Sequence, residues 1–202
     1  ERWCLWLGDC PPDQLRKMPL AMERVEAVRK YRLASKSTPT RKLAATPVRF
    51  HVANMPAGNY LVVPEVSSER RSYIPIGFLN AEVLCSNKLR LLPNATLYHF
   101  GVLTAAMHMA WVRQVTGRLE SRYQYSIKLD YNNYPWPQSV TAKQRTAVEA
   151  AAQAVLDARA KYPTSTLADL YDPLTMPAPL LQAHQALDRA VDRCYRPEPF
   201  PS

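Results

Sequence analysis

Glycine is scarce in this chain, and the scarcity excludes the commonest phosphate-binding loops. The 202 residues include five glycines, and the two closest, Gly101 and Gly117, lie 16 positions apart. A GxGxxG motif or a P-loop needs several glycines within a few residues, so neither is present. No GxSxG or HExxH motif occurs, and no lysine follows an acidic residue by two positions, as in many metal-dependent nucleases. We therefore predict no catalytic residue in this chain.

The sequence also lacks the spacing of metal ligands. Four cysteines lie far apart: Cys4, Cys10, Cys85 and Cys194. They form neither a CxxC pair nor a zinc knuckle, and we interpret them as free thiols in a reducing cytoplasm. Four histidines are similarly scattered: His51, His99, His108 and His184. We interpret them as buried or surface groups and predict no metal site.

Targeting and membrane-spanning features are missing as well. The segment Leu91–Val112 has 22 residues without Asp, Glu, Lys or Arg, which is long enough to cross a bilayer. Pro93, Asn94 and two histidines interrupt it, which favours a buried helix of a soluble protein. We predict no membrane partner and a location in the cytoplasm. The sequence begins at Glu1 without an initiator methionine, so we expect a fragment of a longer chain.

Acidic residues are outnumbered in only one part of the sequence. The net charge is +9, but residues 141–202 carry seven basic and seven acidic residues. Residues 1–140 carry 19 Lys or Arg against 10 Asp or Glu, and the stretch Arg16–Arg49 holds ten basic residues and two acidic ones. Such an asymmetry favours a polyanionic partner, nucleic acid before a membrane. The alternative is a basic surface that only contacts water.

Hydrophobic spacing predicts an α+β fold. A small mixed or antiparallel sheet with packed helices is flanked by an N-terminal basic helix and a C-terminal helical piece. Helices are predicted at Gln14–Ala34, kinked near Pro19, and at Thr96–Thr116, Thr141–Tyr162 and Pro179–Tyr195. Strands are predicted in the apolar runs ERWCLWLGDC, VRFHVA, YLVVPEV, YIPIGFL, LRLLP and IKLDY. The segment GRLESRYQYS (117–126) is predicted to be a loop or a strand edge.

Changes in composition divide the chain into three predicted parts. Residues 1–39 are the end of a helical spacer, 40–137 form the central domain, and 138–202 form the helical C-terminal piece. In the last part, six residues at helical spacing predict a buried stripe on one helix: Val148, Ala151, Ala152, Val155, Leu156 and Arg159. This stripe should pack against the rest of the polypeptide.

A set of polar and basic side chains next to predicted loops has the chemistry to read bases: Arg70, Arg71, Lys88, Arg118, Glu120, Arg122 and Gln124. Arg pairs with guanine, Gln with adenine, and Glu accepts from the amino group of cytosine. Glu120 and Arg122 lie two positions apart, so they should share one side of an extended segment. The alternative interpretation is a surface ion pair, worth under about 1 kcal/mol.

Four long motifs, in order, carry a resemblance to a known family: YIPIGFL, LPNATLYHFGVLTAAMHMAWVRQVTGRLESRYQYS, YNNYPWP and LADLYDPLTMP. They are similar to the C-terminal region of large bacterial class I adenine-specific DNA methyltransferases, including the MmeI-like restriction–modification enzymes. The similarity runs from about Trp3 to Tyr195. In that family one polypeptide carries cleavage, methylation and DNA recognition.

The resemblance implies a DNA target-recognition region without catalysis of its own. The S-adenosylmethionine-binding domain would lie upstream, so no cofactor is expected here, and the partners would be duplex DNA and that upstream domain. Base-reading positions carried over from the family are Lys88, Glu120, Arg122 and Gln124. Phosphate contacts are predicted at Arg29, Lys36, Arg41, Lys42, Arg70, Arg71 and Arg118. The alternative is a protein-interaction module of the same multidomain enzyme, with the C-terminal helices as its contact surface.

Overall fold

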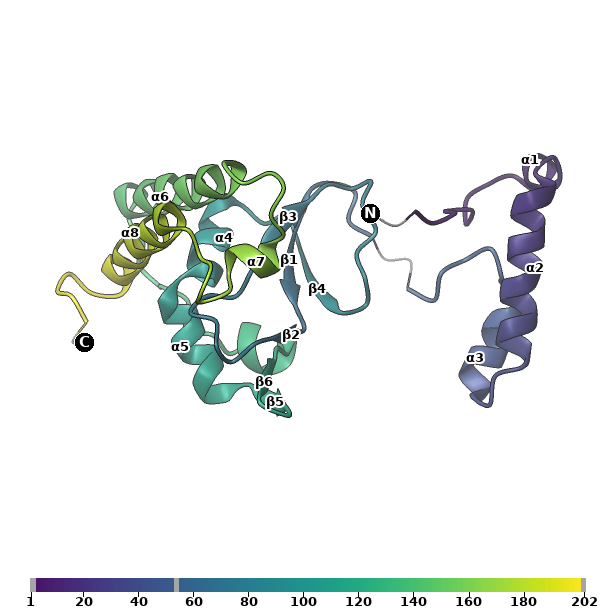
Figure 1. The fold of residues 1–202 in the computed structure, drawn as a ribbon, viewed down its shortest axis with the longest axis horizontal. Helices are drawn as coiled ribbons and strands as arrows, with labels where there is room; N and C mark the ends of the chain where they lie inside the picture. The colour runs from purple at the N-terminus through teal and green to yellow at the C-terminus, as the bar shows by residue number, and fades with distance from the viewer. Residues whose placement is uncertain (1–2, 53–54, 201–202) are drawn as a thin grey trace. The chain divides into compact units, whose positions relative to one another are not determined.

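A computed structural model describes residues 3–52 and 55–200 of the chain and confirms the α+β class. Figure 1 shows helices together with two small sheets. Two compact units are formed, Glu1–Met55 and Pro56–Ser202. We refer to them as the N-terminal unit and the main unit.

The described part of the N-terminal unit is built from three helices, each with a proline at its first or second position. They are α1 (Pro12–Arg16), α2 (Pro19–Leu33) and α3 (Thr38–Lys42), followed by the 3-10 turn η1 (Leu43–Ala45). Proline has no backbone N–H to lose at the first helical positions, and its fixed φ suits them. The predicted continuous helix Gln14–Ala34 is therefore two helices, because Pro19 starts a new one.

Arginine side chains, more than apolar ones, hold the N-terminal unit together. Among the described residues of this unit, the buried hydrophobic ones are Val25 and Ala44. The Arg32 guanidinium donates hydrogen bonds to the carbonyls of Leu43 (2.9 Å), Thr46 (3.0 Å) and Arg49 (2.8 Å). This arginine thus fastens α2 to the segment that follows α3.

Two strand predictions fail in the N-terminal unit. No strand forms in residues 3–10 or 48–52, while Ala53, the last residue of the VRFHVA run, lies outside the described residues. The aromatic residues of the two segments meet instead, since the rings of Trp6 and Phe50 stack with centroids 5.6 Å apart. Side-chain packing between two irregular segments stands in place of the two strands predicted from their apolar composition.

The main unit contains two three-stranded antiparallel sheets. In the first, β1 (Tyr60–Pro64) lies between β3 (Gly77–Leu79) and β4 (Leu89–Pro93). In the second, β6 (Arg122–Gln124) lies between β2 (Val66–Ser67) and β5 (Gly117–Leu119). The strands predicted in YLVVPEV, YIPIGFL and LRLLP are confirmed, and GRLESRYQYS forms the β5–β6 hairpin. β1 leads directly into β2, so one stretch of chain serves both sheets.

The predicted helix Thr96–Thr116 is two helices, α4 (Leu97–Thr104) and α5 (Ala106–Val115). Ala105 separates them with an extended backbone, at φ −73° and ψ 159°. A distant residue supplies a hydrogen-bond acceptor for the N-terminus of α5, because the Ala106 N–H donates to Asp188 Oδ1 at 2.8 Å. Thr116 ends α5 in an extended conformation, so Gly117 begins β5 rather than capping the helix.

The C-terminal helices match their predictions and complete the core. They are α6 (Ala142–Ala160), α7 (Leu167–Leu170) and α8 (Ala178–Tyr195). The Thr141 side chain caps α6 by accepting from the Gln144 N–H. From the predicted stripe, Val148, Ala152 and Val155 are fully buried, and Ala151 and Leu156 are partly buried. Figure 1 shows α6 and α8 side by side, next to α4.

Two further segments differ from their predicted structure. Ile127–Tyr131, predicted as a strand, forms one π-helical turn, which the Asn132 N–H closes by donating to the Ile127 carbonyl at 2.9 Å. The charge-free segment Leu91–Val112 is the end of a strand followed by α4 and most of α5. Within residues 3–52 and 55–200, no helix is long and apolar enough to span a membrane.

Candidate nucleic-acid interface

The β5–β6 hairpin presents the predicted base-reading residues on its outside. Its register pairs Gly117 with Gln124 and Leu119 with Arg122. Arg122 and Gln124 are exposed and alternate with the buried Tyr123. Residues two apart on a strand share one face, so Arg122 and Gln124 project from the same side of β6.

Glu120 lies in the turn of the hairpin and has a left-handed backbone, with φ 58°. Glycine and asparagine usually occupy such a position, since other side chains are strained there. The expectation that Glu120 and Arg122 share one extended segment is therefore wrong. Their side chains nevertheless meet, because Arg122 Nη2 lies 2.5 Å from Glu120 Oε2. With 77% of the Glu120 side chain exposed, the ion pair is open to solvent.

Arg118 borders the same hairpin on the paired strand. Its guanidinium lies over the Tyr123 ring, 4.1 Å from the centroid, and donates to the Ser121 carbonyl at 3.0 Å. A cation over an aromatic face is attracted by the ring. These contacts fix the guanidinium beside the turn while leaving Arg118 exposed.

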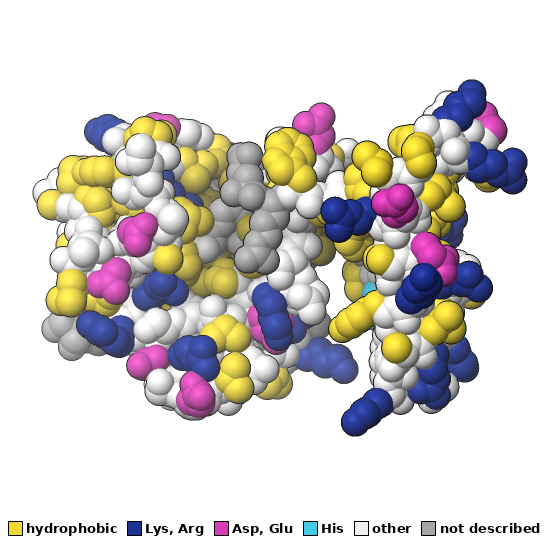
Figure 2. Space-filling model, turned by 45° about the vertical axis from the view of Figure 1, so that its right-hand side comes forward, with side chains coloured by type: hydrophobic (Ala, Val, Ile, Leu, Met, Phe, Trp, Pro, Cys, Tyr) yellow, Lys and Arg dark blue, Asp and Glu magenta, His cyan; other side chains and the backbone are white. Residues whose placement is uncertain are grey.

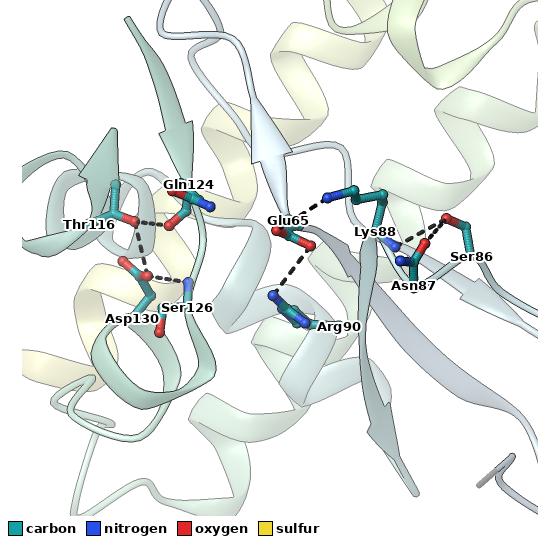
Figure 3. A network of polar contacts seen from close by, with 9 residues as sticks. All are labelled: Glu65, Ser86, Asn87, Lys88, Arg90, Thr116, Gln124, Ser126 and Asp130. Carbon is teal, nitrogen blue, oxygen red and sulfur yellow. Dashed lines mark hydrogen bonds and ion pairs between the residues drawn. The ribbon is translucent and has the colours of Figure 1, made fainter. Parts of the chain in front are cut away.

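Glu65 joins Lys88 to the hairpin (Figure 3). It lies between β1 and β2, and its nearly buried carboxylate forms ion pairs with Lys88 (3.7 Å) and Arg90 (3.3 Å). Its backbone N–H donates to the Lys88 carbonyl, and its carbonyl accepts from the Tyr125 N–H at 2.7 Å. One residue thus connects β4 with the end of β6.

Sequence reasoning missed Glu65 and Arg90. The available signal was the acidic residue inside the otherwise apolar run YLVVPEV. Burying a carboxylate is costly unless cations or hydrogen-bond donors compensate for its charge. A glutamate at that place therefore indicated basic partners, although their positions in the sequence could not be inferred.

Buried polar groups hold the open end of the hairpin. Asp130, on the π-helical turn, accepts from the Ser126 N–H at 2.6 Å and contacts the Thr116 hydroxyl at 3.0 Å. Burial raises the pKa of the Asp130 carboxyl. His108, on α5, donates from Nδ1 to the Leu103 carbonyl, and its Nε2 accepts from the Tyr125 hydroxyl at 3.2 Å. Burial lowers the pKa of His108 to about 4, so it is neutral at pH 7.

Three of the predicted phosphate-binding residues come together in the N-terminal unit. Arg29, Arg41 and Lys42 line an open hollow of about 650 Å³. The Arg41 guanidinium donates to the carbonyls of Ser35 and Lys36. Arg29 forms a long ion pair with Glu26, one helical turn earlier, at 3.6 Å. Figure 2 shows lysine and arginine side chains over this helical part, with few acidic ones between them.

The remaining predicted phosphate contacts lie elsewhere. Lys36 is exposed between α2 and α3. Arg70 and Arg71 follow β2; Arg70 is exposed, while Arg71 is half-buried and its buried Nε has no partner among the described residues. Of this set, Arg118 lies on the hairpin. In the part of the chain that the structure describes, no group of three or more His, Cys, Asp or Glu could hold a metal ion.

Comparisons with known proteins agree with this arrangement. The family described as "MmeI, target recognition domain" matches residues 1–138, and "MmeI, C-terminal domain" matches residues 140–202. DNA methyltransferase A of Bacillus subtilis (strain 168) is 39% identical over 201 residues, covering 100% of this chain and 23% of that protein. This chain thus spans about a quarter of the length of that relative.

A solved structure shares the fold. It is the Type IIL restriction–modification enzyme MmeI in complex with DNA, with a TM-score of 0.93 and 47% identity, covering 99% of this chain and 27% of that one. The two family matches together extend over nearly the whole sequence. The chain therefore belongs to the family of MmeI target recognition domains, joined to the C-terminal domain of the same family.

Proposed function

We propose that this chain is the sequence-specific, duplex-DNA-binding part of a restriction–modification adenine-N6 DNA methyltransferase and catalyses no reaction by itself. The β5–β6 hairpin carries the proposal, because it exposes Glu120, Arg122 and Gln124 together on an element anchored by buried contacts. A relative of nearly the same fold is described in complex with DNA, which supports the same partner here.

Base reading is assigned to four residues with suitable hydrogen-bonding groups. An Arg122 fork fits guanine O6 and N7, Glu120 fits the amino group of cytosine, and Gln124 fits adenine. Lys88 lies on the neighbouring β4 side, where Glu65 holds it near the end of β6. The Glu120–Arg122 ion pair keeps each charge compensated until the bases replace water around it.

Phosphate contacts are assigned mainly to the N-terminal unit. Arg29 and Lys42 are exposed beside the hollow in that unit, and Lys36 is exposed between α2 and α3. Contacts to phosphates set affinity and register without reading sequence. Arg41 and Arg32 donate to backbone carbonyls, so their main contribution is to fold the unit.

Methylation itself is assigned to a separate domain of a longer polypeptide. This chain covers only 23% and 27% of its two relatives, and a domain that binds S-adenosylmethionine is proposed in the remainder. Its substrate is DNA, which supports a location in the bacterial cytoplasm. Incubating the chain with labelled S-adenosylmethionine and duplex DNA should transfer no label, and transfer would contradict this division.

The C-terminal helices do not favour the alternative of a protein-interaction module. Most of their large apolar residues are buried within the chain: Val148 and Val155 of α6, and Leu187 and Val191 of α8, are fully inaccessible, while Leu181 of α8 is exposed. An interaction module needs an exposed contact face. The helices instead act as the support on which α4 and α5 pack.

Selection from a randomised duplex library tests the proposal. The intact chain should enrich one short sequence pattern, and its affinity for unselected DNA should fall steeply with salt, by about 0.9 in log K per log salt for each phosphate contacted. A chain in which alanines replace Glu120, Arg122 and Gln124 should keep the salt dependence and lose the enrichment. If the intact chain enriched no pattern, the proposed function would be wrong.

A further inference from the structure

We propose that Asp130 is a positioning residue for base reading: its carboxyl group, buried under the hairpin, fixes the backbone of Gln124 through the Thr116 hydroxyl. The inference rests on the proposed function, since Gln124 is taken as a base reader. Asp130 itself touches no DNA, because its side chain is completely buried.

The geometry places Asp130 at the open end of the hairpin (Figure 3). Its Oδ2 lies 2.6 Å from the Ser126 nitrogen and 3.0 Å from Thr116 Oγ1. Thr116 Oγ1 is in turn 2.8 Å from the Gln124 carbonyl oxygen. Thr116 immediately precedes β5, and Ser126 follows the end of β6 by two residues. One carboxyl group therefore ties both ends of the hairpin together, opposite the turn at Glu120.

The Thr116 hydroxyl links the carboxyl group of Asp130 to the backbone of Gln124, because it lies within hydrogen-bonding distance of both Asp130 Oδ2 and the Gln124 carbonyl oxygen. The Ser126 N–H donates to the same Oδ2, so the carboxyl group is held at a second point.

Burial raises the pKa of Asp130, whereas its contacts with Ser126 and Thr116 lower it. These two contacts therefore compensate for the burial of the carboxyl group.

The hairpin needs such a tie because its own ladder is short. β5 and β6 have three residues each, and β2, on the other side of β6, has two, so few backbone hydrogen bonds hold this sheet. The Gln124 carbonyl held by Thr116 belongs to the same residue whose side chain faces outward. A hydrogen bond to a base edge depends on that backbone position, and a well-placed bidentate contact discriminates between bases by about ten- to a hundredfold.

The experiment compares three variants of the intact chain with the wild type. The wild type first selects its preferred duplex from a randomised library, and Gln124→Ala identifies the position that Gln124 reads. Asp130→Ala and Thr116→Val should then lose discrimination at that position by about tenfold, with an unchanged salt dependence on unselected DNA. Asp130→Asn should lose less discrimination than Asp130→Ala, because its amide oxygen, placed where Oδ2 lies, can still accept from the Ser126 N–H and the Thr116 hydroxyl.

Asp169→Ala is the matched control. Asp169 makes a similar pair of contacts, to the N–H and hydroxyl of Thr166, but in α7 and far from the hairpin in sequence. It should not change base discrimination. If Asp130→Ala lowers the helical circular dichroism signal, Thr116→Val, which keeps the side-chain shape, decides the question.

Each outcome has one interpretation. A wild-type chain that selects no sequence would overturn the proposed function and this inference with it. If the wild type selects a site and both Thr116→Val and a folded Asp130→Ala retain full discrimination, only the positioning role is wrong. If Asp130→Asn loses discrimination as severely as Asp130→Ala, an oxygen acceptor at this place does not suffice, and the positioning role through Ser126 and Thr116 is wrong.

Discussion

The N-terminal unit and the main unit are built in opposite ways. The N-terminal unit carries eleven basic and five acidic residues, and its described part buries only two hydrophobic side chains. The main unit carries fifteen basic and twelve acidic residues around a continuous core that includes Leu61, Phe100 and Val155. A basic surface with little core suits phosphate contacts, whereas a rigid core can hold a few side chains precisely. The difference suggests that affinity and sequence specificity reside in different units.

The roles of arginine sharpen this comparison. In the N-terminal unit, Arg32 and Arg41 donate to backbone carbonyls at the surface. In the main unit, the buried Arg159 donates to the Ile76 carbonyl at 2.7 Å and to the Tyr171 hydroxyl. Arg159 thus connects α6 with α7 and with the segment before β3. Arg159 is buried, as the predicted stripe on α6 requires, and it is held there by hydrogen bonds as well as by packing.

The largest expected effect comes from deleting part of the main unit. A chain cut after Pro137 lacks α6 and α8 and exposes the α4 face that contains Phe100 and Leu103, both buried in the intact chain. It should show no cooperative thermal unfolding. Deleting residues 1–55 should instead leave the transition of the main unit in place. If the 1–137 piece melted at the same temperature as the intact chain, the C-terminal helices would not support the core.

A single methyl group at Gly101 should weaken the packing of α4 against the same helices. A Cβ there would lie 2.7 Å from Val148 Cγ1 and 3.3 Å from both Ala152 Cβ and Leu187 Cδ1. Overpacking costs about 1–3 kcal/mol, and the better helix propensity of alanine offsets up to about 1 kcal/mol. We expect Gly101→Ala to lower the free energy of unfolding in urea by about 1–2 kcal/mol. Gly58→Ala, with nothing within 4 Å, should change it little, and equal effects would exclude close packing as the cause.

The buried His108 should make the stability of the main unit depend on pH. Its pKa is about 4 when folded, against an ordinary value near 6.5, so the unfolded chain binds the proton more tightly. The resulting stability is complete above about pH 6.5 and disappears as the pH falls toward 4. Between about pH 7 and about pH 5 the decrease amounts to about 2 kcal/mol.

The variant His108→Gln isolates this contribution. The raised pKa values of Asp130 and Asp188 act in the opposite direction, because a carboxyl that stays protonated in the folded state favours folding as the pH falls. Urea unfolding at about pH 7 and about pH 5 should therefore be compared between wild type and variant. The variant should be destabilised less by acidification, and identical pH profiles would show that His108 does not titrate as described.

The smallest expected effect on folding concerns the exposed basic residues of the N-terminal unit. The double change Arg29→Gln with Lys42→Gln should lower the slope of log K against log salt by about 0.9 for each phosphate that is no longer neutralised. Base preference and melting temperature should stay the same. Arg32→Gln is the contrasting variant, because it removes three hydrogen bonds to carbonyls and should destabilise the unit. A changed base preference in the double variant would contradict the proposal that phosphate contacts and base reading lie in different units.

The sequence predicted elements whose causes are local. The Thr141 cap and the regular spacing of Val148, Ala152 and Val155 lie within one helix, so that helix was predictable to within two residues at each end. Apolar runs bounded by proline and glycine likewise identified β1, β3 and β4. The exposed hairpin was predictable as a strand edge, because polar residues dominate it.

Features set by distant residues could not be predicted. The break at Ala105 depends on Asp188, which lies 82 positions from the Ala106 N–H that it accepts from. The π-helical turn depends on the contact of Asp130 with Thr116, and Glu65 is explained only by Lys88 and Arg90. In each case a carboxyl group depends on partners from another element, and periodicity within one segment contains no information about them.

Exchanging the charges of the hairpin pair tests the central claim most directly. The variant Glu120→Lys with Arg122→Asp, introduced into the intact protein, should be compared with the wild type in selection from a randomised duplex library. If the hairpin reads bases, the preferred base should change at one position of the site by about ten- to a hundredfold, while the salt dependence of binding stays nearly the same. If the wild-type preference remained at every position, Glu120 and Arg122 would be no more than a surface ion pair.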